Sequence, residues 1–284
     1  MSLDDTRRSW NVATRQHNAH KRDQAAWLRE NSTLFDDEVM LVADVVGELR
    51  GKRMLHTLCN SGQDTLSWAK RGADIVGVDL SDEAIATAQQ LSADSGIAAR
   101  FVCSEATAFL ESTSERFDVV VGSYGCLCWI EDLPRFMRGV RRVLVDGGRA
   151  VFLEFHPLVW SFDGSFAATK DPYFARAPFV APVQDYVGAA AGALSPSGHI
   201  ADVATIIGSV DVDNPHAASS WQHTTADMVT ALLSAGLTLT TLREYAHSNG
   251  CRVIDGLVVD ADRRWTVPAP YASLPLMLGL AAAR

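Results

Sequence analysis

The chain has 284 residues, of which 48 % are apolar and 21 % charged, so it can bury the core of one large globular domain or of one domain with a lid. Its net charge of −9 argues against a broad phosphate-neutralising surface, and no apolar run is long enough to cross a membrane, so we expect neither nucleic acid nor a membrane as a partner. Five scattered cysteines and an N-terminus without an apolar secretory segment predict a cytoplasmic protein, and the absence of a His or Cys cluster predicts no metal site.

The first fifty residues have helical periodicity. Residues 5–30 repeat apolar and polar side chains at intervals of three and four, and residues 34–49 place apolar side chains at the same spacing before Gly51. Both segments are predicted to be helices. We assign residues 1–50 to a helical N-terminal lid.

Short apolar strands and amphipathic helices alternate from Arg53 to Phe155. The helices carry end signals, since Ser81 is a predicted N-cap, Pro134 lies in a first turn and Gly72 follows a last turn. Regular alternation of this kind predicts an α/β fold, with a parallel sheet that has helices on both faces. The predicted strands cover residues 54–58, 74–80, 99–103, 117–124 and 149–155, and the predicted helices cover residues 63–72, 81–96, 105–113 and 132–144.

The pattern changes after Pro157. Residues 158–220 hold many aromatic side chains among Pro, Gly and Ala, with a predicted strand at 203–212, and we interpret them as an insertion that covers the substrate. A helix is predicted at 223–236, and strands at 237–246 and 274–283. Because no helix separates these two strands, they are predicted to pair antiparallel at the sheet edge. Residues 51–157 and 221–284 therefore form the predicted α/β core.

The turn after the first strand, from Leu58 to Gly62, lies where open α/β sheets bind their ligands. It reads LCNSG and lacks two of the three glycines of a dinucleotide-binding loop, and the chain contains no P-loop sequence. Asp79 and Glu105 follow the next two strands, where carboxylates can accept hydrogen bonds from ribose hydroxyls and an adenine amino group. Each acid has an alternative role at the start of a helix. Their position at the ends of consecutive strands favours an adenosine site.

The run from Arg53 to Phe155 resembles the class I S-adenosylmethionine-dependent methyltransferases. Asp79 matches their ribose-binding acid and Glu105 their adenine-side acid, and the LVDGG at residues 144–148 and the late strand pair also fit. The resemblance implies a Rossmann-like, seven-stranded, mostly parallel sheet and S-adenosylmethionine as the cofactor. The glycine motif departs from the family pattern, because its acid and three glycines correspond to His56, Leu58, Asn60 and Gly62.

One subgroup of these enzymes has a similar loop. Cys59 to Ala69 matches its CNxGQDTLSxA loop, Glu154 to Pro157 its EFHP motif, and Ser220 to Thr224 its SWxHT motif. We therefore expect Asn60 to replace a glycine at positive φ, with an amide that could bond the methionine end of the cofactor. The cofactor-binding residues that the resemblance implies are Leu58, Cys59, Asn60, Gly62, Asp79, Leu80, Ser104, Glu105, Ala106 and Ser123.

Methyl transfer needs few side chains, because the sulfonium supplies the reactivity and the protein aligns the acceptor. His156, after the fifth strand, is the predicted base, and Tyr124, after the fourth, is predicted to contact the sulfonium. The alternatives are a histidine that closes its strand and a tyrosine at the core edge. The predicted substrate-binding residues, for which a solvated helix face or local core packing is the alternative, are His17, His20, Lys21 and Trp129.

Three functions remain open at this point. The first is an S-adenosylmethionine-dependent methyltransferase that acts on a small-molecule substrate in specialised metabolism. The second uses the same cofactor as the substrate: its amine attacks its own γ-carbon, which yields azetidine-2-carboxylate and methylthioadenosine. The third is a non-catalytic binding protein that keeps the nucleotide pocket as a scaffold. The sequence predicts neither the acceptor atom nor the oligomeric state.

Overall fold

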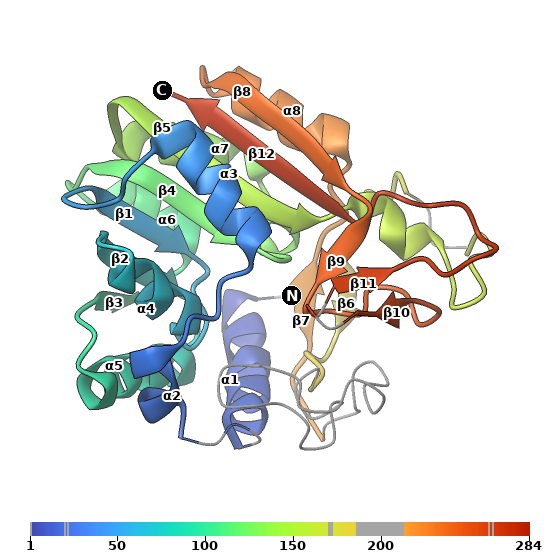
Figure 1. Ribbon diagram of the computed structural model, residues 1–284, viewed down its shortest axis with the longest axis horizontal. Helices are drawn as coiled ribbons and strands as arrows, with labels where there is room; N and C mark the ends of the chain where they lie inside the picture. The colour runs from blue at the N-terminus through green and yellow to red at the C-terminus, as the bar shows by residue number, and fades with distance from the viewer. Residues whose placement is uncertain are drawn as a thin grey trace.

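The computed structural model describes residues 2–19, 21, 23–169, 173–185, 213–260, 262 and 264–284. Its centre is a seven-stranded sheet, which confirms the predicted fold class (Figure 1). The strands lie side by side in the order β3 (Arg100–Cys103), β2 (Asp74–Asp79), β1 (Arg53–Thr57), β4 (Phe117–Ser123), β5 (Leu144–Phe155), β12 (Met277–Ala283) and β8 (Thr238–Tyr245).

Strands β1 to β5 and β8 of this sheet point in one direction and β12 runs against them, so the late pair is antiparallel as predicted. β12 is antiparallel to both β5 and β8, with Met277 opposite Phe155 on one side and opposite Tyr245 on the other. This arrangement places the carboxyl ends of β1 to β5 at one edge of the sheet, and we call it the carboxyl edge. The edge is where ligands of this sheet type bind.

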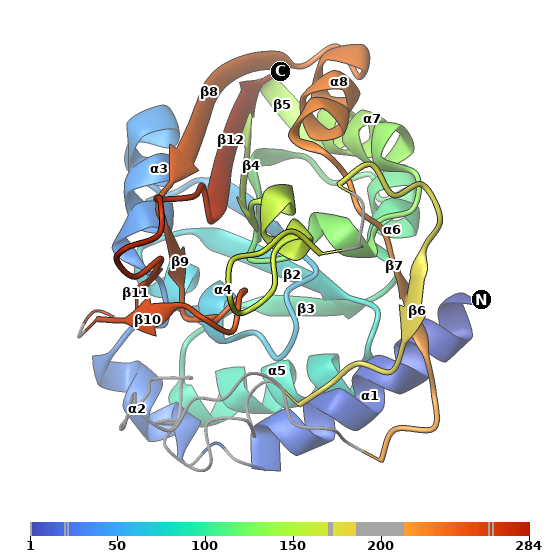
Figure 2. The same ribbon diagram turned by 90° about the vertical axis from the view of Figure 1, so that its right-hand side faces the viewer.

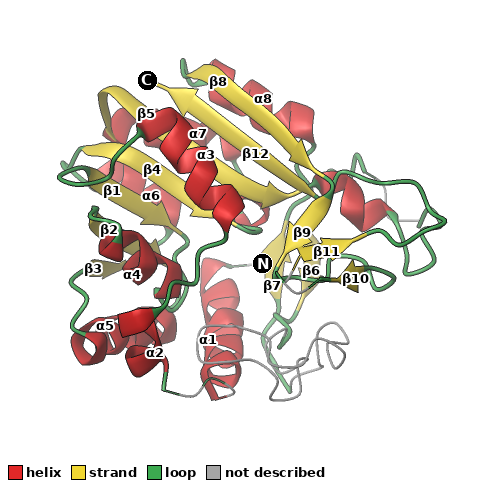
Figure 3. Cartoon of the chain, viewed as in Figure 1, coloured by secondary structure: helices red, strands yellow, loops and turns green. Residues whose placement is uncertain are grey.

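Helices cover both faces of the sheet, because side chains of each strand alternate between two cores. Leu55, Val76 and Val120 face a core shared with α6 (Ala106–Ser112), α7 (Leu133–Val143) and α8 (Thr225–Ser234). Their neighbours Met54 and Val119 face the opposite core. That second face is covered by α3 (Asp36–Val46), α4 (Gln63–Lys70) and α5 (Asp82–Ser95) (Figures 1 and 3).

The N-terminal helix predicted over residues 5–30 is two helices. α1 (Leu3–Ala19) lies along the carboxyl edge and packs against α5, and α2 (Gln24–Glu30) begins at the N-cap Asp23 (Figure 2). The division into a lid at 1–50, a core and an insertion stays a prediction. Within it, α3 packs on the sheet against β5 and β12.

The insertion and the C-terminal region add two small sheets near the carboxyl edge. β6 (Phe179–Ala181) and β7 (Ala218–Ser220) pair antiparallel, and β7 packs against α1. A three-stranded sheet follows β8, and it was not predicted from the sequence. Two short 3₁₀ helices, η1 (Leu127–Trp129) and η2 (Pro157–Ser161), follow β4 and β5. The three-stranded sheet that follows β8 contains β9 (His247–Asn249), β10 (Val258–Val259) and β11 (Arg264–Thr266).

Two predictions fall on residues that the structure does not describe: the strand at 203–212 and the side chain of His20. Within the described ranges, no helix is both long and apolar enough to cross a membrane.

Candidate cofactor site at the carboxyl edge

The loop after β1 keeps the backbone of a glycine loop although it has only one glycine. Leu58, Asn60 and Gly62 have φ angles of 53°, 48° and 77°, so every second residue is left-handed. The prediction that Asn60 takes a positive φ is confirmed. Leu58 does the same, which is uncommon for a residue with a branched side chain. These alternating left-handed residues set the path of the loop along the carboxyl edge.

Two other residues of this loop are fixed by packing. A Cβ on Gly62 would lie 2.7 Å from the Ala88 Cβ and 2.8 Å from the Phe101 ring, so this position needs a glycine for space as well as for φ. The Cys59 thiol is buried, and burial raises its pKa well above the ordinary value. Cys59 can therefore offer a ligand only its backbone.

Asp79 joins the loop to the start of α5. Its Oδ2 accepts the Asn60 N–H at 2.8 Å, and its Oδ1 accepts the Ser81 N–H at 2.9 Å. Burial raises the pKa of Asp79, although the hydrogen bonds from Ser81 and Asn60 oppose this effect. Each oxygen keeps a further lone pair, so the carboxylate is placed to accept ribose hydroxyls at the end of β2.

Glu105 is the N-cap of α6. Its two oxygens accept the N–H groups of Thr107 and Ala108 at 2.8 and 2.6 Å, which is the alternative that the sequence left open. Its adenine role stays a prediction, as do the roles of its neighbours. The Ser104 N–H donates to Asp79 O at 2.9 Å, Ala106 is buried, and Leu80 and Ser123 are half-buried at the ends of β2 and β4.

Tyr124 follows β4 at its carboxyl end, and both its hydroxyl and its ring are held by neighbouring side chains. Its backbone is left-handed, with a φ of 49°, and its hydroxyl accepts a hydrogen bond from Asn249 Nδ2 at 3.1 Å. Its ring lies between Phe35 and Phe155, with centroids 5.9 and 6.0 Å away. Burial, reinforced by the negative charge of Glu38, raises its pKa well above 10, so the hydroxyl stays protonated.

Glu154 of β5 fixes the chain that follows Tyr124, and the sequence analysis assigned it no role. Its carboxylate accepts the N–H groups of Gly125, Cys126 and Leu127 at 2.9, 3.1 and 3.1 Å, and the Cys126 thiol at 2.7 Å. Burial raises its pKa to about 7, against the effect of these four hydrogen bonds. An acid inside the apolar run RAVFLEF was the available signal for such a role.

His156 uses both ring nitrogens in this structure. Its Nδ1 accepts the Leu158 N–H at 3.2 Å, so the proton lies on Nε2, which is 3.1 Å from Glu244 Oε1. Burial lowers the pKa of His156, and the charge of Glu244 opposes this. The residue closes β5 and caps η2, which was its alternative role. Its role as a base stays a prediction.

The predicted substrate-binding residues lie near α1 but face different partners. His17 is buried, and its Nε2 lies 3.2 Å from Gln184 O and 3.7 Å from Asp185 Oδ1, so it faces the insertion. Trp129 packs edge-on against Trp10 of α1, at 5.1 Å between ring centroids. Burial lowers the pKa of Lys21 to about 8, although the charges of Asp64 and Asp185 raise it. Substrate binding by these residues stays a prediction.

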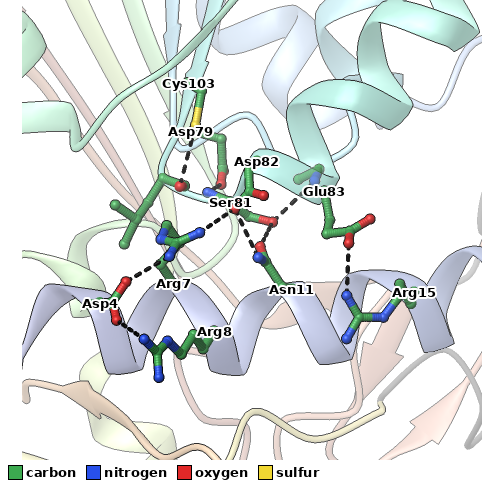
Figure 4. A network of polar contacts seen from close by, with 12 residues as sticks. Asp4, Arg7, Arg8, Asn11, Arg15, Asp79, Ser81, Asp82, Glu83 and Cys103 are labelled. Atoms are coloured by element: carbon green, nitrogen blue, oxygen red, sulfur yellow. Dashed lines mark hydrogen bonds and ion pairs between the residues drawn. The ribbon is translucent and has the colours of Figure 1, made fainter.

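Charged and polar contacts hold α1 against the first turn of α5, beside Asp79. Figure 4 shows Arg7 and Asn11 reaching Asp82, at 2.6 and 2.8 Å, and Arg15 reaching Glu83 at 2.8 Å. The Ser81 hydroxyl donates to Asn11 Oδ1 at 2.7 Å. We call these contacts the α1–α5 latch.

Insertion residues hold the opposite side of α1. The Ser9 hydroxyl accepts the Val183 N–H at 2.9 Å and Asn214 Nδ2 at 3.1 Å. α1 is thus bonded to the core on one side and to residues of the insertion on the other, and it covers the carboxyl edge.

Two buried oxygens of α1 lack a hydrogen-bond partner among the described residues, and they show whether this side of the site suits a polar ligand. Asn18 Nδ2 donates to Ser61 Oγ of the loop at 3.1 Å, but Asn18 Oδ1 makes no hydrogen bond, and neither does Thr14 Oγ1 one turn earlier. A buried polar atom without a partner costs about 1–3 kcal/mol. A polar group bound between α1 and the loop would remove that cost, so these residues fit the amino-acid end of S-adenosylmethionine.

A metal site would need several of the side chains that commonly bind metal ions to lie together. Among the described residues, no three His, Cys, Asp or Glu side chains lie close enough together to hold a metal ion.

Comparison with known proteins agrees with this geometry. The family model described as a methyltransferase domain matches residues 55–152, which run from β1 into β5. A ubiquinone biosynthesis O-methyltransferase of Pseudomonas fluorescens is 32 % identical over 107 residues, which are 37 % of this chain and 44 % of that protein. The chain therefore spans less than half the length of this curated relative.

Solved structures share the fold over most of the chain. An S-adenosylmethionine-dependent methyltransferase from Mesorhizobium loti covers 87 % of this chain and 97 % of its own, with a TM-score of 0.52 and 18 % identity. A structure titled the [4+2]-cyclase SpnF covers 87 % of this chain and 77 % of its own, with a TM-score of 0.54 and 16 % identity. Residues 55–152 thus match a methyltransferase domain, and the chain shares its seven-stranded fold with solved structures of S-adenosylmethionine-dependent methyltransferases.

Proposed function

We propose that the protein transfers the methyl group of S-adenosylmethionine to a small-molecule acceptor. The observation that carries the proposal is the loop after β1, in which Leu58, Asn60 and Gly62 alternate as left-handed residues and Asp79 accepts the Asn60 N–H. This geometry lets the backbone lie flat against a ligand beside a carboxylate that can accept ribose hydroxyls. The relative from Pseudomonas fluorescens is named for O-methyl transfer in ubiquinone biosynthesis, which supports a small-molecule acceptor.

The chain contributes alignment and exclusion of water. When bound, the cofactor would supply an electrophilic methyl carbon on a sulfonium; an acceptor that bonds to this carbon in line would release S-adenosylhomocysteine as the leaving group. α1 and the insertion close the carboxyl edge, which keeps water from competing with the acceptor. Tyr124, held by Asn249, is fixed beside this edge with its hydroxyl protonated, so it acts as a hydrogen-bond donor and not as a base.

His156 is the proposed base for an acceptor that must lose a proton. To take that proton on Nδ1, it has to release the Leu158 N–H, whereas its Nε2–H can stay on Glu244. A carboxylate partner of this kind stabilises the imidazolium that forms. The assignment to specialised metabolism stays a prediction.

The experiment starts with the cofactor alone and then adds acceptors. Purified protein is incubated with S-adenosylmethionine, first by itself and then with a panel of small phenols, amines and carboxylates, and the adenosine products are measured by mass spectrometry. The expected result is S-adenosylhomocysteine that forms only with particular acceptors, together with the matching methylated product.

Other outcomes would contradict the proposal in distinct ways. Methylthioadenosine in equal amount with a cyclic C4 amino acid, formed without any acceptor, would establish the cyclase alternative. Tight cofactor binding without turnover over the whole panel would favour the scaffold alternative. The fold is compatible with other chemistry, since a neighbour with the same fold is titled a cyclase.

A further inference from the structure

A cavity of about 380 Å³ lies between α8, the first turn of α7 and residues 175–177 of the insertion. Figure 2 shows the segment that leads into β6 running past α7 and α8. No residue assigned above to the cofactor site lines this cavity, and neither does His156 or Tyr124. The cavity is therefore separate from the proposed cofactor site.

One wall of the cavity is formed by three successive residues that precede α8. Trp221, Gln222 and His223, which belong to the SWxHT motif, all line it. The Trp221 N–H donates to Cys128 O at 2.8 Å, after β4. Gln222 Nε2 donates to Pro157 O at 2.7 Å, after β5. This wall is therefore bonded to the chain that follows two strands of the main sheet.

His223 gives the wall a fixed hydrogen-bond acceptor. Its Nε2 lies 2.7 Å from Ile130 O, and a carbonyl oxygen can only accept, so Nε2 carries the proton and Nδ1 has a free lone pair. Nδ1 makes no hydrogen bond with a described residue. Burial lowers the pKa of His223, although its hydrogen bond with Ile130 opposes this, so the neutral ring is favoured at pH 7.

The charged side chains that line the cavity are two carboxylates and one guanidinium, which leaves a formal charge of −1. Glu131 makes no hydrogen bond or ion pair with a described residue. Asp227 uses its Oδ2 for Arg176, at 3.0 Å, and for the Thr224 N–H, at 3.0 Å. Its Oδ1 has no partner among the described residues. Acceptors that are still free are therefore more numerous here than free donors.

A positively charged donor complements such a wall. An ammonium group brings several N–H donors and the missing positive charge. Leu133, Pro134 and Ala231 supply apolar surface in the same cavity, and Trp221 adds an indole ring, a group that attracts cations. These residues suit a ligand that has an apolar body and an ammonium end.

We propose that this cavity binds a small organic ammonium ion. Its N–H groups donate to His223 Nδ1 and to the carboxylates of Glu131 and Asp227, while its apolar body lies against Leu133 and Pro134. This site goes beyond the proposed function, because binding in the cavity needs no cofactor. A methyl acceptor and a ligand that is not transformed would share this chemistry, and the test separates them.

The test uses two probes that share an apolar body and differ in the polar end. Phenethylamine carries an ammonium group, whereas phenethyl alcohol carries a neutral hydroxyl. Their dissociation constants are measured by calorimetry in phosphate buffer, because Tris is itself an amine.

Three variants are compared with the wild type. Glu131→Gln removes a charge from the cavity, and Ala226→Leu adds a side chain on an exposed position of α8 that lines it. Glu48→Gln is the matched control, because it removes the same charge from an exposed residue after α3. Urea denaturation shows that each variant is folded.

The wild type should bind phenethylamine about tenfold or more tightly than phenethyl alcohol, as expected for hydrogen bonds that involve a charged group. Glu131→Gln should weaken phenethylamine about three- to fivefold, the range for an exposed charge, and leave phenethyl alcohol within about twofold. Ala226→Leu should weaken both probes, and Glu48→Gln neither. When S-adenosylmethionine is added, N-methylated phenethylamine would identify a methyl acceptor, and unchanged phenethylamine a ligand that is not transformed. The site stands in either case.

Three results would overturn the inference. Equal affinity of the wild type for both probes would remove the ammonium assignment. Unchanged affinity for phenethylamine in both Glu131→Gln and Ala226→Leu would place its binding elsewhere. No saturable binding of phenethylamine up to about 10 mM would refute an amine site. The binding measurements contain no S-adenosylmethionine, so their failure is distinguishable from failure of the proposed function.

Discussion

At the scale of single residues, Asp79 shapes the cofactor site before any ligand is bound. It accepts N–H groups from Asn60 and Ser81 and so holds the loop after β1 against the start of α5. A buried carboxylate that accepts backbone N–H groups leaves them unpaired when it is removed. Loss of Asp79 should therefore affect both the loop and the ligand.

Asp79→Ala should weaken S-adenosylhomocysteine by at least about tenfold, because two charge-assisted hydrogen bonds to ribose and the shape of the loop are lost together. Calorimetry measures the affinity, and urea denaturation should show a loss of about 1–3 kcal/mol in the free energy of unfolding. Asp79→Asn keeps one acceptor oxygen, so its affinity for S-adenosylhomocysteine should lie between those of the wild type and Asp79→Ala. An unchanged affinity in Asp79→Ala would remove the ribose assignment.

Gly62→Ala should be much more destabilising than Gly96→Ala, although the two glycines have nearly the same φ angles of 77° and 72°. A Cβ at Gly62 meets Ala88 and Phe101, whereas a Cβ at Gly96 meets no atom within 4 Å. We expect a loss of about 1 kcal/mol for Gly96→Ala and about 2–5 kcal/mol for Gly62→Ala, measured by urea denaturation. Similar losses would show that crowding at Gly62 is relieved by movement of its neighbours.

At the scale of elements, α1 is held by contacts of two kinds. The latch to α5 uses charged side chains at the surface, such as Arg7 and Arg15, whereas the insertion holds α1 through the buried Ser9. Exposed ion pairs are weak and screened by salt, and buried hydrogen bonds are not. The side of α1 next to Asp79 is therefore expected to open first.

Raising the salt concentration should speed the release of a bound cofactor. Between about 0.05 M and 1 M NaCl, the dissociation rate of S-adenosylhomocysteine measured by stopped-flow fluorescence should rise several-fold, because screening weakens the α1–α5 latch. Arg7→Ala should raise the rate at low salt and reduce its salt dependence. Arg135→Ala, which breaks the exposed pair with Glu111 between α6 and α7, is the control and should change neither. A rate independent of salt would show that α1 opens from the insertion side.

At the scale of the whole molecule, two buried groups give opposite dependences of stability on pH. The pKa of Glu154 is raised from 4.5 to about 7 by burial, so its contribution is full below pH 4.5 and is lost as the pH rises through 7. The pKa of His56 is lowered from 6.5 to about 4, so its contribution is full above pH 6.5 and is lost as the pH falls towards 4. Between pH 4.5 and 6.5, the effects of Glu154 and His56 on the free energy of unfolding change in opposite directions with pH and partly cancel in the wild type.

Glu154→Gln should separate the two effects, because glutamine does not titrate. Between pH 5 and pH 8, the wild type should lose up to about 3 kcal/mol in the free energy of unfolding relative to Glu154→Gln. Urea denaturation of both proteins at each pH measures this difference. A constant difference would mean that Glu154 stays ionised throughout, with its four hydrogen bonds outweighing its burial.

The sheet could be predicted from the sequence because its signals are local. Apolar runs alternate with helices that have recognisable ends, and these patterns predicted all seven strands of the main sheet. The strands β9, β10 and β11 were missed because two or three residues are too few to show a period. The break between α1 and α2 was missed because helical spacing continues across it, although Asp23 was an available N-cap signal.

The candidate site was only partly predictable, because its partners are distant in the sequence. Asp79 and Asn60 could be identified from the ends of strands and from a motif. Asn249, which bonds Tyr124, lies 125 positions away in an unpredicted strand. His17 was predicted to bind the substrate, which stays a prediction; its contact with Gln184 of the insertion could not be predicted, because the side of a helix that faces another segment depends on tertiary packing.

The left-handed side chains of the loop after β1 also matter for engineering. A glycine loop offers a ligand only bare backbone, so its specificity cannot be altered there without breaking the turn. Here Leu58 and Asn60 adopt the same backbone angles while carrying side chains. The Leu58 side chain packs against the core, so Asn60 is the position open to substitution, and a library at 60 provides a route to variants that accept altered cofactor analogues on an unchanged sheet.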